Sequence, residues 1–322
     1  MGLDLDIKPF LFRLKKTLST SQGILSHRKG WLLRLENEFG DIGWGEVSPM
    51  SSTEWEICSN LIYSLRPSQT REELELLIPN WPGSLGFGFG AAFAELDGLV
   101  RSESQTPWLM APTSAFLLSV DRDLISNIDS FGTAFCDKKN PITIKLKVGM
   151  GEDLDEQNLI RNFLDRLPVD YRLRLDPNTS WDRIRANYWA DCFLKDPRLE
   201  WFEQPLPADD VNGLRELAKR VPIALDESLF FDPSLRKTWK GWQVRRPTLE
   251  GDPRELLRQL DKGIAYVALS TAFETGIGLR WVSHLAALQQ KGPTPTAPGL
   301  APGWSPEGDL FSADPQLVWE AV

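Results

Sequence analysis

The sequence predicts an α/β protein in which a closed barrel of β/α units follows a smaller α+β domain. From residue 106 onward, short apolar runs alternate with longer amphipathic stretches. This alternation is typical of parallel strands, because such strands need long crossover connections. At least seven runs of this kind can be counted, and that number favours a closed barrel over an open sheet. The first hundred residues instead combine a hairpin pattern with helical patterns.

Residues 1–105 are expected to form the α+β domain. The segment WLLRLENEFGDIGWGEVSP predicts two strands joined by a turn through Asn37 and Gly40. EWEICSNLIYSL and GAAFAELDGLV have apolar residues at helical spacing. Between them, the Gly- and Pro-rich PNWPGSLGFGFG is expected to be a loop, and a polar break at Ser102–Pro107 is the expected domain boundary.

Residues 106–300 are expected to form the barrel. Its strands are predicted in AFLLSV, ITIKLKVG, YRLRLDPN, LEWFEQP, IALDES, WQVRRP and YVALSTA, with an eighth near Pro295–Gly299. Amphipathic segments such as DEQNLIRNFLDRL and DPRELLRQLDKG, which lie between the runs, predict the helices. Residues 301–322 have little periodicity, and this tail is expected to pack back on the N-terminal domain.

Composition narrows the classes of function. A net charge of −9 argues against a nucleic-acid partner or an anionic membrane. No apolar run approaches the length of a membrane span, and the N-terminus does not resemble a secretory signal. Three widely spaced cysteines fit a reducing cytoplasm. With only two histidines, chemistry based on carboxylates and lysines is expected, acting on a small-molecule substrate; no protein partner is implied.

Two lysines share one face of a predicted strand. In ITIKLKVG, Thr143, Lys145 and Lys147 alternate with apolar residues that suit the helix layer. The polar face then brings two ammonium groups to the barrel mouth, where active sites of such barrels lie. The alternative is an edge strand with a solvated lysine face, but a closed barrel has no free edge.

Three successive strands each end in a carboxylate: Asp176, Glu203 and Asp226. Each could instead cap a helix. Together on neighbouring strands, however, they would repel one another unless a cation lay between them. Oxygen ligands without His or Cys indicate a hard ion such as Mg²⁺, with Mn²⁺ as a substitute.

A divalent ion beside lysines suggests proton abstraction next to a carboxylate. The ion would polarise a bound substrate carboxylate and stabilise an enediolate. Lys147 lies nearer the strand end and is expected to be the base, with Lys145 tuning it electrostatically. Burial and the neighbouring ammonium are expected to lower the pKa of the base.

These motifs resemble the enolase superfamily. KLK at 145–147, LRLDPN at 173–178, WFEQPLP at 201–207 and ALDES at 224–228 are similar to its muconate-cycloisomerase subgroup, and most closely to the o-succinylbenzoate synthases. GWGEVSP, FAELD, RPTLEG and LSTAFETGIGL extend this resemblance over nearly the whole chain. It implies a modified (β/α)7β TIM-like barrel beneath a capping domain whose loops, here residues 22–30 and the stretch around Ser48, close over the substrate.

The resemblance also implies an activity. Enzymes of this kind dehydrate 2-succinyl-6-hydroxy-2,4-cyclohexadiene-1-carboxylate in syn geometry to o-succinylbenzoate, on the route to menaquinone and phylloquinone. Mg²⁺ would be held by the three strand-end carboxylates. Backbone amides around Ser270 and Thr271, at a helix start, would bind the succinyl carboxylate, and Gly299 would lie against the same arm. Asn178 and Arg174, on the face of Asp176, are expected to contact the substrate as well.

One position departs from the superfamily, in which the sixth strand carries a lysine. The spacing to Gly251 places Arg246 in register with that lysine, whereas strand alternation with Trp242 and Val244 as helix-facing residues favours Arg245. We favour Arg246, although both arginines could instead be structural and pair with carboxylates. An arginine stays protonated, so it can place a cation over a diene ring but cannot be a second base.

That substitution separates the alternatives. A dehydration that uses one base remains possible with arginine at this position, whereas the epimerisation of N-succinylamino acids or dipeptides, which needs two bases, does not. A muconate-type cycloisomerase is a further alternative within the subgroup. A barrel that only binds ligands, or is purely structural, is disfavoured because the lysines and carboxylates on the strands are intact.

Overall fold

The computed structural model describes residues 2–20, 23–65, 68–100, 107–120, 124 and 142–322. The chain divides into two compact units. Unit 1 comprises Met1–Pro112, Arg245–Ala265 and Leu269–Val322, and unit 2 comprises Thr113–Val244 and Tyr266–Ala268. Unit 1 therefore combines the two ends of the sequence. The domain boundary expected between residues 105 and 106 lies outside the described residues.

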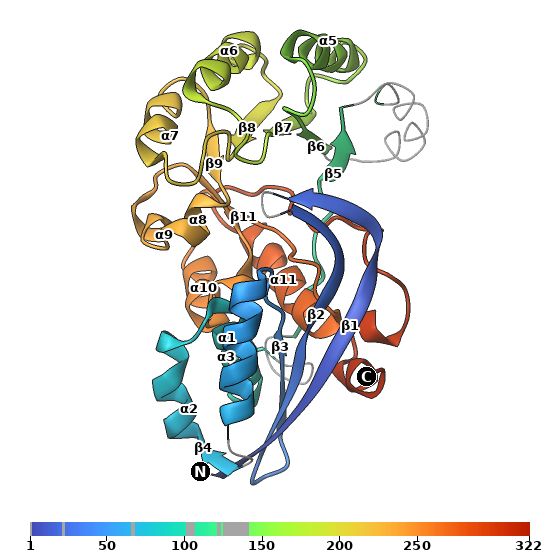
Figure 1. The fold of residues 1–322 in the computed structure, drawn as a ribbon, viewed down its shortest axis with the longest axis vertical. Coiled ribbons are helices and arrows are strands. Elements are labelled where there is room, and N and C mark those ends of the chain that lie inside the picture. Colours follow the sequence, from blue (N-terminus) through green and yellow to red (C-terminus); the bar gives the residue numbers. More distant parts are fainter. Residues whose placement is uncertain (1, 21–22, 66–67, 101–106, 121–123, 125–141) are drawn as a thin grey trace. The chain divides into compact units, whose positions relative to one another are not determined.

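An antiparallel sheet with the order β3-β2-β1-β4 forms the frame of unit 1 (Figure 1). Its strands are β1 (Gly2–Thr20), β2 (Gly23–Asn37), β3 (Ile42–Val47) and β4 (Ser68–Thr70). The predicted turn between β2 and β3 is confirmed: the Asn37 carboxamide accepts the amides of Phe39 and Asp41, and Gly40 has a φ of +81°.

The segment expected to be a closing loop is a strand. Residues 23–30 form the first half of β2 and pair with β1 in antiparallel register, for example His27 with Arg13, while Gln22 lies outside the described residues. Local composition could not reveal this, because the pairing depends on the unusual length of β1. The buried Arg28 of β2 donates to the carbonyls of Ser48 and Pro49, at 2.5 and 2.8 Å.

Helices α1 (Ser52–Ser64), α2 (Arg71–Leu77) and α3 (Gly83–Leu96) complete the N-terminal part of unit 1, with a 3₁₀ turn at Ile78–Asn80. The glycine-rich stretch expected to be a loop is largely helical, because α3 already begins at Gly83. Glycines serve close packing here: a Cβ on Gly45 would lie 2.0 Å from the carbonyl oxygen of Gly88. Backbone contact between β3 and α3 outweighs the poor helix propensity of glycine.

The C-terminal part of unit 1 is mainly helical. Its elements are the 3₁₀ turn Pro247–Leu249, α10 (Pro253–Asp261), α11 (Gly276–Gln289), the 3₁₀ turn Asp309–Phe311 and α12 (Pro315–Glu320). Trp304, Phe311 and Val318 of the tail form one apolar cluster with Phe10 and Phe12 of β1. Lys8 also donates to the carbonyls of Trp319 and Val322, at 2.9 and 3.1 Å.

A parallel sheet curled into a half-barrel forms the frame of unit 2, with the order β11-β10-β9-β8-β7-β6-β5 (Figure 1). All seven predicted strands are present: β5 (Phe116–Ser119), β6 (Thr143–Lys147), β7 (Arg172–Asp176), β8 (Leu199–Glu203), β9 (Ile223–Leu225), β10 (Trp242–Arg245) and β11 (Val267–Leu269). Near the expected eighth strand, the described residues form an isolated bridge between Ser270 and Gly299.

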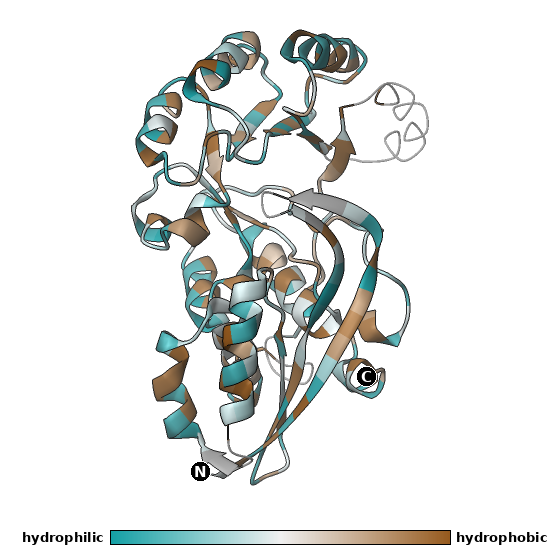
Figure 2. Cartoon of the chain, in the orientation of Figure 1, coloured by the Kyte–Doolittle hydropathy of each residue, from teal (hydrophilic) through white to brown (hydrophobic). Residues whose placement is uncertain are grey.

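Helices connect the strands of unit 2: α5 (Asp153–Leu164), α6 (Arg183–Phe193), α7 (Val211–Leu217), α8 (Ser228–Phe231) and α9 (Leu235–Thr238). In Figure 2, α5 and α6 show the mixture of apolar and polar residues expected of helices with one buried face. Strand residues such as Leu146, Leu175 and Phe202 cluster with helix residues such as Phe163 and Trp189. Within the described part of the chain, no helix has both the length and the apolar character needed to span a membrane.

Candidate active site

The predicted lysines and carboxylates come together at the C-terminal ends of neighbouring strands of unit 2. Lys147 ends β6, Asp176 ends β7 and Glu203 ends β8, while Asp226 directly follows β9. The parallel register pairs Lys147 with Asp176. The carboxylates are buried, with exposed fractions of 1% for Asp176, 2% for Glu203 and 3% for Asp226. Strand pairing therefore concentrates three acids and two bases in one buried region.

Both lysines contact carboxylates directly. The ammonium of Lys145 lies 2.7 Å from Asp176 Oδ2 and also donates to Glu203 Oε1. The ammonium of Lys147 lies 2.6 Å from the same Asp176 Oδ2 and donates to Asn178 Oδ1. These are charge-assisted contacts, and they give the buried carboxylates the partners that a buried charge needs.

These contacts raise the pKa of Lys145. Burial lowers the pKa of Lys145, but the charges of Asp176 and Glu203 outweigh that effect. In the same way, burial raises the pKa of Asp176, while the ammonium groups of Lys145 and Lys147 hold it well below its usual range.

The donor chemistry of the strand ends suits a hard cation. A positive group, the Lys145 ammonium, already bridges Asp176 and Glu203 and interacts electrostatically with Asp226. Among the described residues, however, no three His, Cys, Asp or Glu side chains are gathered closely enough to hold a metal ion. A divalent ion would therefore have to take the place of the Lys145 ammonium between the carboxylates.

Asn178 and Arg174 occupy different surroundings within unit 2. Asn178 follows β7 with a φ of +46°, and its amide donates to Asp176 Oδ1 at 3.0 Å, so it lies beside the carboxylates. Arg174 is deeper in β7 and is only 2% exposed. Its guanidinium pairs with Glu200 at 2.7 Å and lies 4.0 Å from the ring centroid of Trp201.

The orientation predicted from the sequence for two residues of β10 is wrong. Trp242 and Val244 of β10 were expected to face the helices, but they cluster with Trp201 of β8. Trp201 lies on the face of Glu203, because the two residues are two apart on one strand. Large aromatic residues thus fill the inside of the curled sheet, and alternation along β10 now favours Arg246, as the motif spacing does.

The two arginines that follow Val244 have different partners in unit 1. Arg245 is buried, and its Nε lies 2.5 Å from Glu250 Oε2. Arg246 is half-buried, and its Nη1 donates to the carbonyl of Thr271 at 2.5 Å. Arg245 therefore has the structural role that the alternative hypothesis gave to both arginines, with Glu250 as its partner.

The backbone amides expected to be free for an anion are engaged within unit 1. The amide of Ser270 donates to the carbonyl of Arg245 at 2.9 Å, and that of Thr271 donates to the carbonyl of Gly299 at 3.0 Å. The N-terminus of α11 is occupied as well, since Glu46 accepts the amides of Thr275 and Gly278, each at 3.0 Å. A carboxylate from distant β3 thus fills the anion site expected at this helix.

Sequence reasoning missed Gln204, which shapes the loop after β9. Gln204 is fully buried with a φ of +38°, and its side-chain oxygen accepts the amides of Asp226 and Ser228, at 3.1 and 3.0 Å. It thereby fixes the backbone that carries Asp226. The signal that could have revealed it is a glutamine directly after Glu203 at a strand end. A side-chain amide there needs hydrogen-bond partners, whereas an apolar residue would need none.

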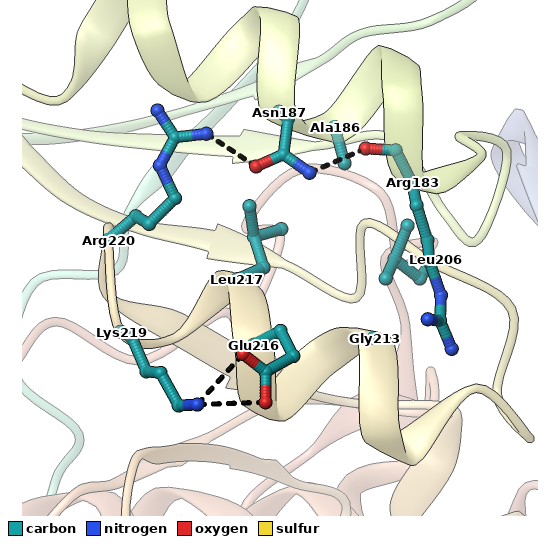
Figure 3. Close-up of a pocket in the computed structure, with 9 residues that line it drawn as sticks. All are labelled: Arg183, Ala186, Asn187, Leu206, Gly213, Glu216, Leu217, Lys219 and Arg220. Carbon is teal, nitrogen blue, oxygen red and sulfur yellow. Dashed lines mark hydrogen bonds and ion pairs between the residues drawn. The ribbon is translucent and has the colours of Figure 1, made fainter.

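A pocket of about 300 Å³ lies between α6 and α7 of unit 2, and none of the predicted site residues line it (Figure 3). Its charged side chains are paired: Arg183 with Asp210, Arg220 with Asp191, and Lys219 with Glu216 at 2.8 Å. Asn187 also donates to the carbonyl of Arg183 and accepts from the Arg220 guanidinium. The pocket therefore belongs to the helix layer and is separate from the strand-end carboxylates.

Comparisons with known proteins agree with the motifs. Residues 137–236 match the family model described as Enolase C-terminal domain-like. An o-succinylbenzoate synthase of Thermosynechococcus vestitus is 32% identical over 84% of this chain and 85% of its own length. One from Edwardsiella ictaluri is 27% identical over 86% of this chain and 83% of its own length.

Solved structures agree as well. The o-succinylbenzoate synthase of Thermosynechococcus elongatus, solved with Mg in its active site, has a TM-score of 0.81 and 28% identity, covering 99% of this chain and all of its own. The L-Ala-D/L-Glu epimerase of Bacillus subtilis, at 19% identity and a TM-score of 0.70 over 95% of this chain and 91% of its own, shares the fold. This chain belongs to the o-succinylbenzoate synthase family of the enolase superfamily.

Proposed function

We propose that this enzyme dehydrates 2-succinyl-6-hydroxy-2,4-cyclohexadiene-1-carboxylate to o-succinylbenzoate. The observation that carries the proposal is the contact of Lys145 and Lys147 with one buried carboxylate, Asp176, at adjacent strand ends. Membership of the o-succinylbenzoate synthase family supports it. The product belongs to the route to menaquinone and phylloquinone, and the substrate is a small carboxylate.

We propose that Asp176, Glu203 and Asp226 hold Mg²⁺, which Mn²⁺ could replace. The Mg-bound structure of a relative with 28% identity supports this choice. When bound, the ion supplies positive charge that stabilises negative charge developing on the substrate carboxylate. Gln204 holds the backbone of Asp226, and Trp201 donates to Glu203 Oε2 at 3.4 Å, so both residues orient the ligands.

Lys147 is the proposed base. As a free amine it would take the proton from the ring carbon that bears the carboxylate, and it would then hand that proton to the departing hydroxyl, which leaves as water. Using one lysine for both transfers explains a syn elimination, because both bonds break on one face of the ring. The side-chain oxygen of Asn178 accepts a hydrogen bond from the Lys147 ammonium and so orients it. Lys145 would tune the electrostatic environment of Lys147.

The remaining site residues are proposed to bind the substrate. Arg246 would place a cation against the diene ring, a role that depends on charge and position alone. Ser270 and Thr271 would line the site of the succinyl carboxylate, with Gly299 leaving room for that arm. The Ser270 hydroxyl is 3.1 Å from the carbonyl oxygen of Gly299. Arg174 would act on the substrate indirectly, through its contact with the ring of Trp201.

The finer description of the fold is part of this proposal. We propose that the parallel sheet completes a modified (β/α)7β TIM-like barrel, that residues 1–105 form the capping domain, that residues 106–300 form the barrel, and that the tail 301–322 completes the capping domain. A cytoplasmic location, without nucleic-acid or protein partners, fits the charge and cysteine content.

A direct assay tests the proposed function. The purified protein with Mg²⁺ should convert the cyclohexadiene substrate to o-succinylbenzoate, observed as growth of the aromatic absorbance. A parallel incubation with N-succinylamino acids and dipeptides in D₂O examines epimerisation. Dehydration without inversion of an amino acid is the expected result. Rapid inversion without dehydration would contradict the proposal.

A further inference from the structure

We propose that Glu274 is a positioning residue for Arg246. This inference rests on the proposed function, in which Arg246 contacts the substrate. Glu274 lies in the turn between β11 and α11, and its side chain is only 1% exposed. It is outside the set of lysines and carboxylates expected to act in catalysis, yet its carboxylate joins the two segments of unit 1 that carry Arg246 and its hydrogen-bond acceptor.

The contacts of Glu274 connect those two segments. Its Oε1 accepts the Thr248 hydroxyl at 2.7 Å and the Ala272 amide at 2.7 Å, and its Oε2 accepts the Thr271 hydroxyl at 2.5 Å. Thr248 lies two residues after Arg246, whereas Thr271 and Ala272 belong to the turn after β11. One buried carboxylate therefore fixes the distance between two chain segments about 25 residues apart.

Arg246 depends on the same turn. Its Nη1 donates to the carbonyl of Thr271 at 2.5 Å. Glu274 thus holds Thr271 through its hydroxyl, while Thr271 holds Arg246 through its carbonyl. The backbone amide of Arg246 is anchored separately, by Glu250 Oε1 at 2.8 Å. With the main chain fixed at Glu250, the Glu274–Thr271 contact contributes to the position of the guanidinium.

The turn is held in a conformation that needs support. Phe273 has a φ of +62°, which is unfavourable for a bulky residue, and it is buried. Its amide donates to the Thr271 hydroxyl at 2.8 Å, the same hydroxyl that donates to Glu274. A buried carboxylate is also costly unless it is well paired. Both features indicate that the conformation of this turn is maintained because it positions Arg246. A turn that only connected β11 to α11 would not need it.

The experiment compares Glu274→Gln with wild type in dehydration kinetics. The glutamine side chain has the same volume as glutamate and keeps one acceptor oxygen, but it has an NH₂ donor in place of the second oxygen. We expect kcat/KM to fall by about 10- to 100-fold, mainly through KM, because displacing a binding group costs about that much. Binding of the product o-succinylbenzoate should weaken in parallel. Thr248→Val, which removes only one hydrogen bond to Glu274, should cause a smaller loss of the same kind.

Glu95→Gln is the matched control. Glu95 is a buried glutamate of unit 1 that also contacts α11, through Arg280 at 2.5 Å and Trp281 at 3.2 Å. Among the described residues, its side-chain hydrogen bonds go to Arg280, Trp281 and the Trp44 amide and not to the turn. Both glutamine variants should lower the melting temperature, whereas Glu95→Gln should leave kcat/KM within about 3-fold of wild type. If the two variants lose similar stability but only Glu274→Gln loses kcat/KM, then Glu274 is a positioning residue and its role is not purely structural.

A double-mutant cycle provides the sharpest readout. If Glu274 acts through Arg246, then Glu274→Gln should cost less than about 3-fold in an Arg246→Met background. An equal loss in both backgrounds, or an unchanged kcat/KM in Glu274→Gln, would overturn the inference. If Glu274→Gln does not fold, unchanged kinetics in Thr248→Val would overturn it instead. Wild type without dehydration activity contradicts the proposed function itself and removes the basis of this inference.

Discussion

The ammonium of Lys147 lies 2.6 Å from Asp176 Oδ2, so the proposed base touches a proposed metal ligand. This contact would link the two proposed functions of the site, because proton transfer and charge stabilisation would occur within one hydrogen-bond length. It also explains why the residues occur as a set. Without Asp176, Lys147 would lose its charged partner, and without both Lys145 and Lys147 or a metal ion, Asp176 would be an unpaired buried charge.

Replacing Lys147 with alanine should abolish dehydration. Loss of a general base costs about 10²- to 10⁴-fold, and here the same lysine is proposed to serve both proton transfers. Rates are measured with the cyclohexadiene substrate, and folding by circular dichroism. Lys219→Ala, at an exposed position in the pocket of Figure 3, is the control and should be fully active. Wild-type turnover by the Lys147 variant would rule out this residue as the base.

Mg²⁺ should stabilise the protein, and the stabilisation should depend on Asp176. A ligand at 100 times its Kd contributes about 2.7 kcal/mol to the free energy of unfolding. Thermal unfolding is followed with increasing Mg²⁺, and EDTA should abolish both the rise in melting temperature and the activity. In Asp176→Asn the rise should disappear. A melting temperature that responds equally to Mg²⁺ in this variant would place the ion elsewhere.

Arg246→Lys should retain part of the dehydration activity, whereas Arg246→Met should lose most of it, because the proposed role needs a positive charge near the ring. The lysine variant also offers a test of the one-base mechanism, since lysine can lose its proton and arginine cannot. Exchange and inversion of an N-succinylamino acid in D₂O are measured by NMR. Inversion should be absent in wild type; its presence there would show that a second base exists.

The stability of unit 1 should fall as pH rises through neutrality. Burial raises the pKa of Glu46 from 4.5 to about 7, while hydrogen bonds from Thr275 and Gly278 oppose that rise. Its stabilising contribution is therefore complete below about pH 4 and is lost as pH rises through 7, by up to about 3 kcal/mol. Glu46→Gln stays neutral and can keep the acceptor for these donors, so its unfolding free energy should depend less on pH.

Urea denaturation at pH 5 and pH 8 measures that difference. Glu216→Gln, on the exposed surface of α7, is the control and should show the slope of wild type. Identical pH slopes for wild type and Glu46→Gln would mean that Glu46 does not take up a proton on folding.

The sequence predicts the parallel strands of unit 2 well, for a physical reason. Parallel strands alternate with amphipathic helices, and each strand end that carries Asp176, Glu203 or Asp226 is marked by a polar residue next to an apolar run. These signals are local, so they can be read without knowledge of tertiary contacts. The antiparallel turn through Asn37 and Gly40 is predicted for the same reason.

The features that sequence reasoning missed depend on distant partners. The amide hydrogens expected to be free at α11 are taken by Glu46, which lies 229 residues earlier in the chain than Thr275. The glycine-rich start of α3 is helical because β3 packs against it. Trp242 and Val244 face the interior because the curled sheet must be filled, and period-2 alternation alone cannot say which of two faces is inside.

The composition of unit 1 has a consequence for protein synthesis. The apolar face of β1, with Phe10 and Phe12, is covered by tail residues such as Trp304 and Val318. At about 5–20 residues per second, the ribosome makes the tail roughly 15 to 60 seconds after the strand. During that interval the nascent chain exposes an apolar strand face, which is a hazard for aggregation.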